Sequence, residues 1–230
     1  MQTFKHRDDI VLEDLKTKNI NGKRHYVTPN GNYPSVTSVT SFDSAEGIKA
    51  WRAKIGEKKA QEIITKASTR GTKVHKLCED YINNISEEHH DPVFNSIKRE
   101  LDYNLGTIYA VEAPLYSDDL RVAGRVDLIA EWGPDPDNRK LAIIDFKTST
   151  KVKKEEWLEG YFMQEAAYAF MFFERMNQKT EFMIKKIVTI IGIDHKGQAD
   201  VKVKNPGKYI DKFIDLRNRY EKANASKVSH

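Results

Sequence analysis

The segment from Leu141 to Lys147 reads LAIIDFK, four apolar residues followed directly by an acid, a phenylalanine and a lysine. A short run that is apolar on both faces is typical of a central strand covered by helices on each side. Residues two apart on a strand point the same way, so Asp145 and Lys147 should share one face. A carboxylate and an ammonium at the end of such a strand cost stability unless something binds there. The segment therefore predicts a buried sheet with a polar site at its edge.

Other patterns predict further strands beside this segment and helices that cover them. β-Branched and apolar runs bounded by turn residues predict four more strands, at 107–116, 121–131, 185–194 and 199–204. Apolar residues at helical spacing predict helices at 44–67, 74–81, 91–101, 157–174 and 209–220. The β-prone runs at 24–27 and 33–39 flank Asn30-Gly31, which predicts a hairpin. This order of elements predicts an α/β fold with a central mixed sheet of about five strands flanked by helices.

The length of 230 residues fits one domain with a substantial core. We expect a lead-in and hairpin over residues 1–43, a helical region over 44–105 and the main sheet with its helices over 106–222. The remaining residues, 223–230, are expected to form a flexible tail.

The composition excludes several kinds of protein. The single cysteine, Cys78, rules out an internal disulfide and a cysteine-ligated zinc or iron–sulfur site, and its apolar neighbours favour a core position. The longest apolar runs are too short to span a bilayer, and residues 1–9 carry acids in place of an apolar signal core. We therefore expect an intracellular soluble protein without membrane contact. The net charge of +4 is compatible with nucleic acid as a partner but does not require it.

Asp127 ends the motif GRVD within another expected strand, and it could bring a second carboxylate to Asp145. Two converging carboxylates suit a hard divalent cation such as Mg²⁺, which takes oxygen ligands and keeps waters for a substrate. That ion would hold a scissile phosphate and activate a water, and Lys147 would stabilise the charge that develops. An ordinary ion pair at the end of a strand is the simpler interpretation of the D-x-K tripeptide alone. The choice between an ion pair and a metal site therefore depends on the other polar residues of the chain.

Two expected helices carry polar pairs four residues apart, a spacing that puts both members on one face. The first pair is His75 and Glu79, where His75 could add a nitrogen ligand to the same cation. The second pair is Gln164 and Tyr168. Gln164 could orient a phosphate or Lys147, and Tyr168 could stack on a base or bind the nucleic-acid backbone. Considered singly, each of these residues is better explained as an ordinary polar residue at the edge of a packed helix.

Taken in order, these residues form four motifs: GTxVHxxxE at 71–79, GRVD at 124–127, IDFKTS at 144–149 and QxxxY at 164–168. Their order resembles the RecB-like branch of the PD-(D/E)XK nuclease superfamily. Within that branch it is similar to the group of the mitochondrial genome maintenance exonuclease and its bacterial and phage relatives. The stretch PSVTSV at 34–39 also looks like the opening segment of that group, so the resemblance covers residues 33–175.

The resemblance implies a restriction-endonuclease-like core and a metal-dependent exonuclease that acts on single-stranded DNA ends in replication, repair or recombination. It implies Mg²⁺ as the cofactor, with Mn²⁺ as a substitute. No iron–sulfur cluster is expected, because the four cysteines of cluster-bearing relatives are absent. The implied catalytic residues are Asp127, Asp145, Lys147 and Gln164. The implied metal ligands are His75, Asp127, Asp145 and the carbonyl of Phe146, with Glu79, Arg125 and Tyr168 as accessory members. The Pro-Asp pairs at 134–137 lie in a turn-rich loop and are not expected to supply the aspartate of the motif.

A set of polar and basic residues near the expected site could bind the DNA. Its members are Ser35, Thr37, Arg70, Lys73, Lys151, Lys153, Lys154 and Trp157. Lysines could follow the phosphate backbone while an aromatic ring stacks on a base. The alternative is a solvated charged face, with Trp157 in the core. The basic helical region at 44–85 could also form an arch over the strand, which would favour threading of single strands with free ends.

Three other functions fit parts of the pattern. An endonuclease on the same core would cut circular as well as linear DNA. A nucleic-acid-binding module without catalysis has no need of buried acids that repel phosphate. A structural metal-binding protein would gain stability from metal without turnover. As an exonuclease, the protein would work beside replication or recombination proteins, in the bacterial cytoplasm, in a host cell if phage-encoded, or in mitochondria if processed.

Overall fold

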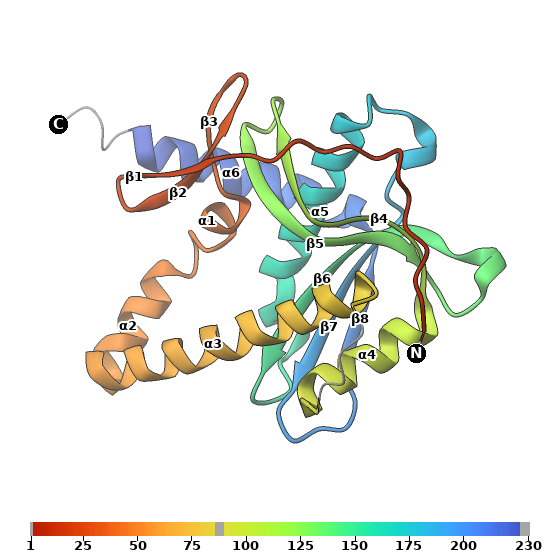
Figure 1. The fold of residues 1–230 in the computed structure, drawn as a ribbon. Coiled ribbons are helices and arrows are strands. Elements are labelled where there is room, and N and C mark those ends of the chain that lie inside the picture. The colour runs from red at the N-terminus through yellow and green to blue at the C-terminus, as the bar shows by residue number, and fades with distance from the viewer. Residues whose placement is uncertain (1, 86–89, 226–230) are drawn as a thin grey trace.

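The computed structural model describes residues 2–85 and 90–225 as a five-stranded sheet between two layers of helices, with a small second sheet beside it (Figure 1). The strands are β1 (Thr17–Ile20), β2 (Lys23–Thr28), β3 (Gly31–Pro34), β4 (Leu105–Ser117), β5 (Val122–Trp132), β6 (Lys140–Ser149), β7 (Lys186–Ile193) and β8 (Asp200–Lys204). The helices are α1 (Val36–Thr40), α2 (Ala45–Ile55), α3 (Glu57–Ile82), α4 (Pro92–Asn104), α5 (Glu159–Arg175) and α6 (Ile210–Ala225). Short 3₁₀ turns are η1 (Pro136–Asn138), η2 (Glu155–Leu158), η3 (Thr180–Phe182) and η4 (Pro206–Lys208).

The main sheet has the strand order β4-β5-β6-β7-β8. Within it β6 and β7 run parallel, and the other neighbouring strands run antiparallel. A parallel pair needs a crossover connection, which helix α5 supplies between these two strands. The predicted mixed sheet of five strands is therefore confirmed, and so is the hairpin around Asn30-Gly31, which joins β2 to β3.

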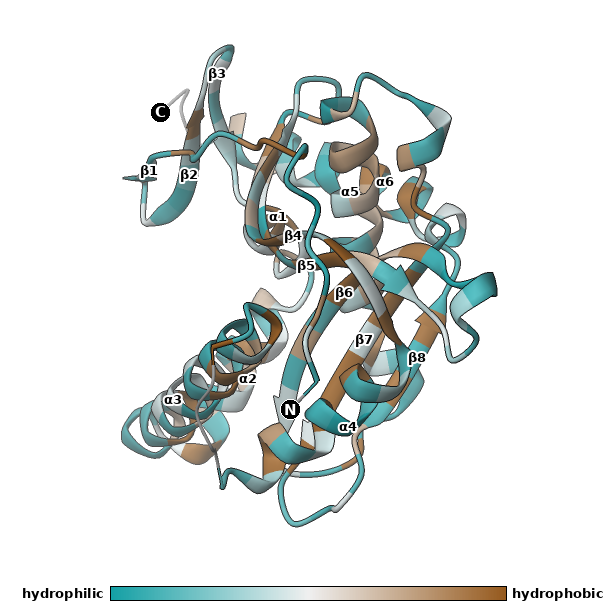
Figure 2. Cartoon of the chain, turned by 45° about the vertical axis from the view of Figure 1, so that its right-hand side comes forward, coloured by the Kyte–Doolittle hydropathy of each residue, from teal (hydrophilic) through white to brown (hydrophobic). Residues whose placement is uncertain are grey.

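Alternation along β6 assigns its residues to the two helical layers. Ile143 packs in one apolar cluster with Phe162 of α5, and Ile144 packs in the other with Val74 of α3. Asp145 follows Ile143 on the face covered by α5. Figure 2 shows the apolar residues concentrated on the strands of the main sheet, which agrees with the prediction of a central, doubly covered strand.

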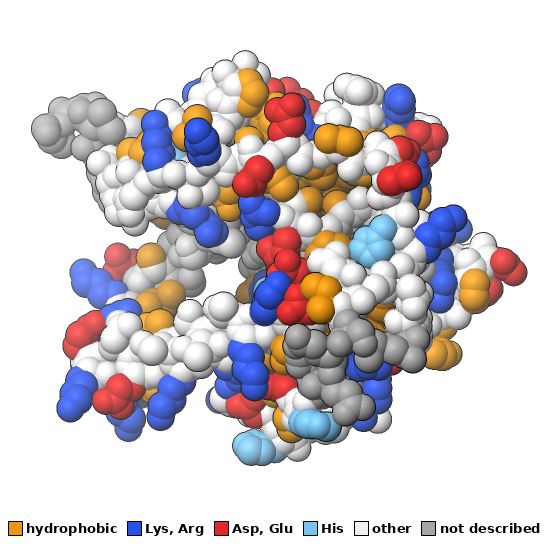
Figure 3. All heavy atoms as spheres, in the orientation of Figure 1, with side chains coloured by type: hydrophobic (Ala, Val, Ile, Leu, Met, Phe, Trp, Pro, Cys, Tyr) orange, Lys and Arg blue, Asp and Glu red, His pale blue; other side chains and the backbone are white. Residues whose placement is uncertain are grey.

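Helix α2 and residues 57–70 of α3 form an arm that projects from the body of the protein (Figure 1). No residue of α2 is buried, and Ala60 alone is buried among residues 57–70. Gly56 has φ 87°, a left-handed conformation that glycine adopts without strain, and it lets the chain reverse between two helices where one was predicted over 44–67. A notch separates the arm from the surface built by the small sheet (Figure 3).

Three details differ from the predictions. The lead-in expected before the hairpin within residues 1–43 contains strand β1, and Phe4 is buried against Tyr81. The β-prone run at 33–39 splits, because Ser35 caps helix α1 by accepting a hydrogen bond from the backbone N–H of Ser38. Helix α6 continues to Ala225, so the first residues of the tail expected at 223–230 are helical, and residues 226–230 lie outside the described residues. Among the described residues, no helix combines the length and hydropathy of a membrane span.

Candidate metal centre and active site

Asp127 lies where strands β5 and β6 stop pairing. Their antiparallel register ends at the pair Leu128 and Ile144. Beyond that pair, the backbone N–H of Phe146 donates a hydrogen bond to Asp127 Oδ2 at 2.8 Å. The Asp127 carboxylate thus occupies the space between the two strands, where side chains from both helical layers can reach it.

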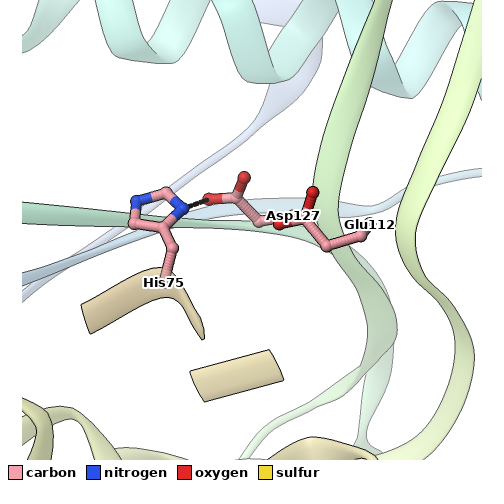
Figure 4. Close-up of side chains that lie close together, drawn as sticks. All are labelled: His75, Glu112 and Asp127. Atoms are coloured by element: carbon pink, nitrogen blue, oxygen red, sulfur yellow. Dashed lines mark ion pairs between the residues drawn. The ribbon is translucent and has the colours of Figure 1, made fainter. Parts of the chain in front are cut away.

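Three potential metal ligands meet at this position (Figure 4). They are His75 from α3, Glu112 from β4 and Asp127 from β5, and one donor atom of each lies within 4.8 Å of the others. His75 Nδ1 lies 3.5 Å from Asp127 Oδ2. One imidazole nitrogen and two carboxylates from three different elements form a set that can hold a divalent cation.

Glu112 is a member of this cluster that the sequence did not predict. Val111 pairs with Leu128 across β4 and β5, so the next residue, Glu112, lies opposite Asp127. The φ of Glu112 is 47°, in the left-handed region that costs a non-glycine residue about 1–2 kcal/mol. The Arg125 guanidinium donates a hydrogen bond to the carbonyl of Glu112. Arg125, expected as an accessory residue, therefore supports the strained backbone and lies outside the group of ligands.

The carboxyl groups of this cluster resist ionisation. Burial and the neighbouring charge of Asp127 raise the pKa of Glu112 to about 7. Burial and the charge of Asp145 raise the pKa of Asp127 to about 6, although His75 and Lys147 act in the opposite direction. A cation bound between these groups would relieve their repulsion, so the electrostatics of the cluster fits a metal site.

Asp145 and Lys147 form the second part of the site, and their predicted position on one face is confirmed. Lys147 Nζ forms an ion pair with Asp145 Oδ2, and Gln164 Nε2 donates a hydrogen bond to Asp145 Oδ1 at 3.2 Å. The Lys147 ammonium also lies 4.9 Å from the centre of the Tyr161 ring. Burial by itself would lower the pKa of Lys147, but the charges of Asp145 and Asp127 outweigh it and hold that pKa above the ordinary lysine value.

Tyr168 is buried and packs directly against the backbone of Gly124. A methyl group on Gly124 would lie 2.7 Å from Tyr168 Cε1, closer than atoms can approach. The glycine of the GRVD motif, Gly124, is therefore needed so that this ring can pack beside β5. Because Tyr168 is 2% exposed, its ring is not available to stack on a base, and it serves the packing of α5 on the sheet.

Glu165 is a second residue near the site that the sequence reasoning missed. It lies on α5 next to Gln164, and its side chain is fully buried. Burial and the charge of Asp145 raise the pKa of Glu165 well above the ordinary glutamate value. An acid inside the apolar stretch of α5 was the sequence signal that could have identified it.

A cavity of about 470 Å³ opens beside His75 and Glu112. Glu79 lines this cavity but binds Lys76 at 3.5 Å and does not join the cluster of three ligands. Solvent and a substrate can therefore reach the ligands from this side of helix α3.

Two of the residues expected to bind DNA lie at the start of helix α1. Ser35 is buried, and its hydroxyl caps that helix. Thr37 Oγ1 accepts a hydrogen bond from Arg24 at 3.3 Å. The cation beside this segment is thus Arg24, a residue of strand β2 that the sequence reasoning did not single out. Arg24 is exposed whereas Ser35 is buried, so Arg24 is the residue that a phosphate could reach.

Arg70 and Lys73, also expected to bind DNA, form ion pairs within the protein. Arg70 Nη1 lies 2.7 Å from Asp194 Oδ2, and its Nε donates a hydrogen bond to Thr148 Oγ1 at 3.2 Å. Lys73 Nζ lies 2.8 Å from Asp91 Oδ2. These contacts tie α3 to the ends of β6 and β7 and to the start of α4.

The loop after β6 carries the remaining residues of the expected DNA-binding set. Trp157 is 58% exposed, so the alternative that places it in the core is wrong. Lys154 lies over the Trp157 ring, and Lys153 donates a hydrogen bond to the Tyr161 hydroxyl at 2.8 Å. With the exposed Lys151, these side chains form an exposed basic and aromatic surface that begins two residues after the last residue of the IDFKTS motif.

Comparison with known proteins identifies a family that this chain matches. A family model described as the PD-(D/E)XK nuclease superfamily matches residues 41–227. Among the curated proteins, none matches the chain by sequence. One solved structure, titled "Crystal structure of SSO0001", covers 80% of this chain and 72% of its own length, at 14% sequence identity and a TM-score of 0.41.

Proposed function

Because this chain belongs to the PD-(D/E)XK nuclease superfamily, we propose that it is a metal-dependent deoxyribonuclease that hydrolyses phosphodiester bonds. The observation that carries the proposal is the cluster of His75, Glu112 and Asp127 at the fork between β5 and β6, beside the pair Asp145 and Lys147. The cluster offers ligands to a cation, and the pair offers a positive charge next to it. In a protein that only bound nucleic acid, these buried acids would lower the stability of the fold and repel the phosphates without a compensating role.

We propose Mg²⁺ as the bound ion, with Mn²⁺ as a substitute, since carboxylates favour hard cations over softer ones. His75, Glu112, Asp127 and Asp145 would hold the ion, with the carbonyl of Phe146 as the further ligand that the resemblance implies. When bound, the ion would neutralise charge on the scissile phosphate and lower the pKa of a water molecule.

The surrounding side chains position the reacting groups. Lys147 carries a compact positive charge that stabilises the negative charge developing on the phosphate. Gln164 keeps Asp145 oriented through its hydrogen bond to Oδ1, and the N–H of Phe146 does the same for Asp127. Both aspartates are thus held by a partner from a neighbouring strand or helix.

Within the family, we propose an exonuclease that acts on the ends of single-stranded DNA during replication, repair or recombination. The order of the four motifs supports this, because it resembles the RecB-like branch and the group of the mitochondrial genome maintenance exonuclease. The arm supports it as well, since it carries more lysines and arginines than acids and stands off from the body across a notch (Figure 3). A single strand could lie in such a notch with its phosphates against the lysines and arginines of the arm.

Cleavage of end-labelled single-stranded DNA, linear and circular, tests this function in Mg²⁺ and in EDTA. We expect loss of the linear substrate in Mg²⁺ alone and no loss of circles. Cutting of circles at the same rate would instead assign an endonuclease. If the folded protein bound DNA and cut none, a binding module would be the better account, and metal-dependent stability without turnover would indicate a structural metal site.

A further inference from the structure

Glu165 is a buried acid to which the proposed reaction gives no role. Oε1 accepts a hydrogen bond from the Thr189 hydroxyl, and Oε2 has no hydrogen-bond partner in the part of the chain that the structure describes. The side chain is 0% exposed. A buried polar atom left without a partner costs about 1–3 kcal/mol, and more when the group is charged. An uncharged side chain of the same shape would fill this space at lower cost, so stability does not explain the acid.

Glu165 lies next to the proposed catalytic residues. Thr189 of β7 pairs in register with Asp145 of β6, so both side chains project toward the face covered by α5. Helix α5 contacts them with consecutive residues, because Gln164 binds Asp145 and Glu165 binds Thr189. The charge of Glu165 also contributes to the raised pKa of Lys147.

Both oxygens of Asp145 are engaged in this structure. Oδ1 accepts the hydrogen bond from Gln164, and Oδ2 is in the ion pair with Lys147. A cation that binds Asp145 needs one of these oxygens, and at such a short distance its charge repels the Lys147 ammonium. The Lys147 side chain is 20% exposed, so an ammonium that leaves Asp145 needs another partner within the protein.

We propose that Glu165 is this partner: once a cation occupies Asp145, the Lys147 ammonium moves from Asp145 Oδ2 to Glu165 Oε2. The cation and the arriving ammonium both favour the carboxylate form of Glu165. Glu165 is then a positioning residue, which determines where the charge of Lys147 stands relative to the phosphate. This inference rests on the proposed function, because it requires a cation at Asp145.

The alternative is that Glu165 only anchors α5 to β7 through Thr189. Two substitutions separate these roles. Glu165→Gln keeps an acceptor for the Thr189 hydroxyl and removes the charge, whereas Thr189→Val removes the hydroxyl and keeps the charge. If Glu165 is only an anchor, Thr189→Val loses stability and Glu165→Gln, which keeps the hydrogen bond, retains both its stability and its activity. A partner for Lys147 gives a loss of activity in Glu165→Gln without a loss of stability.

Glu174→Gln is the matched control, because Glu174 lies on the same helix and uses both oxygens, one for Ser117 and one for the N–H of Asp118. Thermal unfolding and steady-state cleavage of linear single-stranded DNA are measured for each variant. We expect Glu165→Gln to unfold no earlier than wild type and to lose about 10-fold or more in kcat at an unchanged KM. We expect Glu174→Gln to lose stability and keep its kcat, and Thr189→Val to keep most of its kcat.

A crystal structure with Ca²⁺ gives a readout that does not depend on turnover, since Ca²⁺ also takes carboxylate oxygens. We expect an ion at Asp145 and Lys147 Nζ within about 3.2 Å of Glu165 Oε2. An ion at Asp145 with Lys147 still remote from Glu165, or a Glu165→Gln variant with wild-type kcat, overturns the role of Glu165 and leaves the nuclease function intact. A wild-type protein that cuts no DNA and binds no ion at Asp145 overturns both proposals.

Discussion

The backbone N–H of Phe146 donates a hydrogen bond to Asp127 Oδ2 at 2.8 Å, just beyond the last paired residues of β5 and β6. A side chain of one strand therefore takes the place that a backbone carbonyl would have in a continuous ladder. The N–H of Phe146 is satisfied, the strands stay apart, and Asp127 is held close to His75. The site therefore opens where β5 and β6 separate, while β6 continues to pair with β7.

Glu112 should be needed for binding of the metal ion. We expect Glu112→Gln to weaken the binding of Mg²⁺ or Mn²⁺ by about 10-fold or more, because it removes a charged ligand from a cluster of three. Calorimetric titration of the metal into the protein measures the change. Glu79→Gln is the control, since Glu79 lines the same cavity outside the cluster. Equal losses in the two variants would show that the cavity attracts cations by its general charge and has no defined site at Glu112.

The metal-free protein should lose stability as the pH rises. The pKa of Asp127 is about 6 against an ordinary value of 3.8, so between these values the folded state binds more protons than the unfolded state. Stability then falls as pH rises through this window, by on the order of 2–3 kcal/mol for this one group. Glu112, with a pKa of about 7 against 4.5, acts in the same direction at slightly higher pH.

Thermal unfolding in EDTA across pH 4 to 8 measures this dependence. Because other groups also titrate, the quantity of interest is the difference between wild type and Asp127→Asn. The variant should be favoured over wild type at high pH and lose this advantage at low pH, and added Mg²⁺ should reverse the order at high pH. A constant difference between the two proteins would mean that Asp127 ionises at its ordinary pKa.

Gly124→Ala should destabilise the protein and also reduce its activity. The added methyl group displaces the Tyr168 ring, at a cost of about 1–3 kcal/mol, and shifts α5, which carries Gln164. Gly192→Ala is the control, because its methyl group would lie 2.6 Å from Val93 Cγ1, on the opposite layer of helices. Denaturant unfolding should show a loss in both variants, with kcat reduced for Gly124→Ala alone. A Gly124→Ala protein with wild-type kcat would show that the position of Tyr168 is unimportant for the site.

Trp157→Ala should weaken the binding of single-stranded DNA without lowering stability. Base stacking on an aromatic side chain contributes about 1–3 kcal/mol, so we expect a Kd at least about 5-fold higher. Tyr103→Ala is a matched control, because Tyr103 is 68% exposed but lies on helix α4. Fluorescence anisotropy with a labelled oligonucleotide in EDTA measures binding without cutting. A Kd that is unchanged in Trp157→Ala would place the strand elsewhere on the surface.

The sequence was sufficient to predict Asp145 and Lys147 as neighbours, because alternation along a strand is a local rule. The order of the four motifs, through the family that it resembles, also predicted that His75 would lie beside Asp127. The partner of Gln164 was predicted as a phosphate or Lys147, and the structure shows Asp145 in that position. Which residue Gln164 contacts depends on the position of α5 along the sheet. The spacing of residues within the helix does not determine that position.

Glu112 and Glu165 were missed for a different reason. Glu112 joins the cluster through the register of β4 against β5 and through a left-handed backbone, and neither has a local sequence signal at this residue. Glu165 has such a signal, since it interrupts an apolar helix, but its polar partner Thr189 lies on another strand. Tertiary packing determines the positions of Glu112 and Glu165, and local sequence patterns do not predict that packing.

The most direct test of the central claim is Mg²⁺-dependent cleavage of linear single-stranded DNA by wild type, Asp145→Asn and Lys147→Ala. Thermal unfolding first establishes that both variants are folded. We expect wild type to cut in Mg²⁺ and not in EDTA. We expect each variant to lose about 10²-fold or more in kcat, the scale for groups that act on charge in the transition state. Folded variants that cut at the wild-type rate would contradict the proposed roles of Asp145 and Lys147.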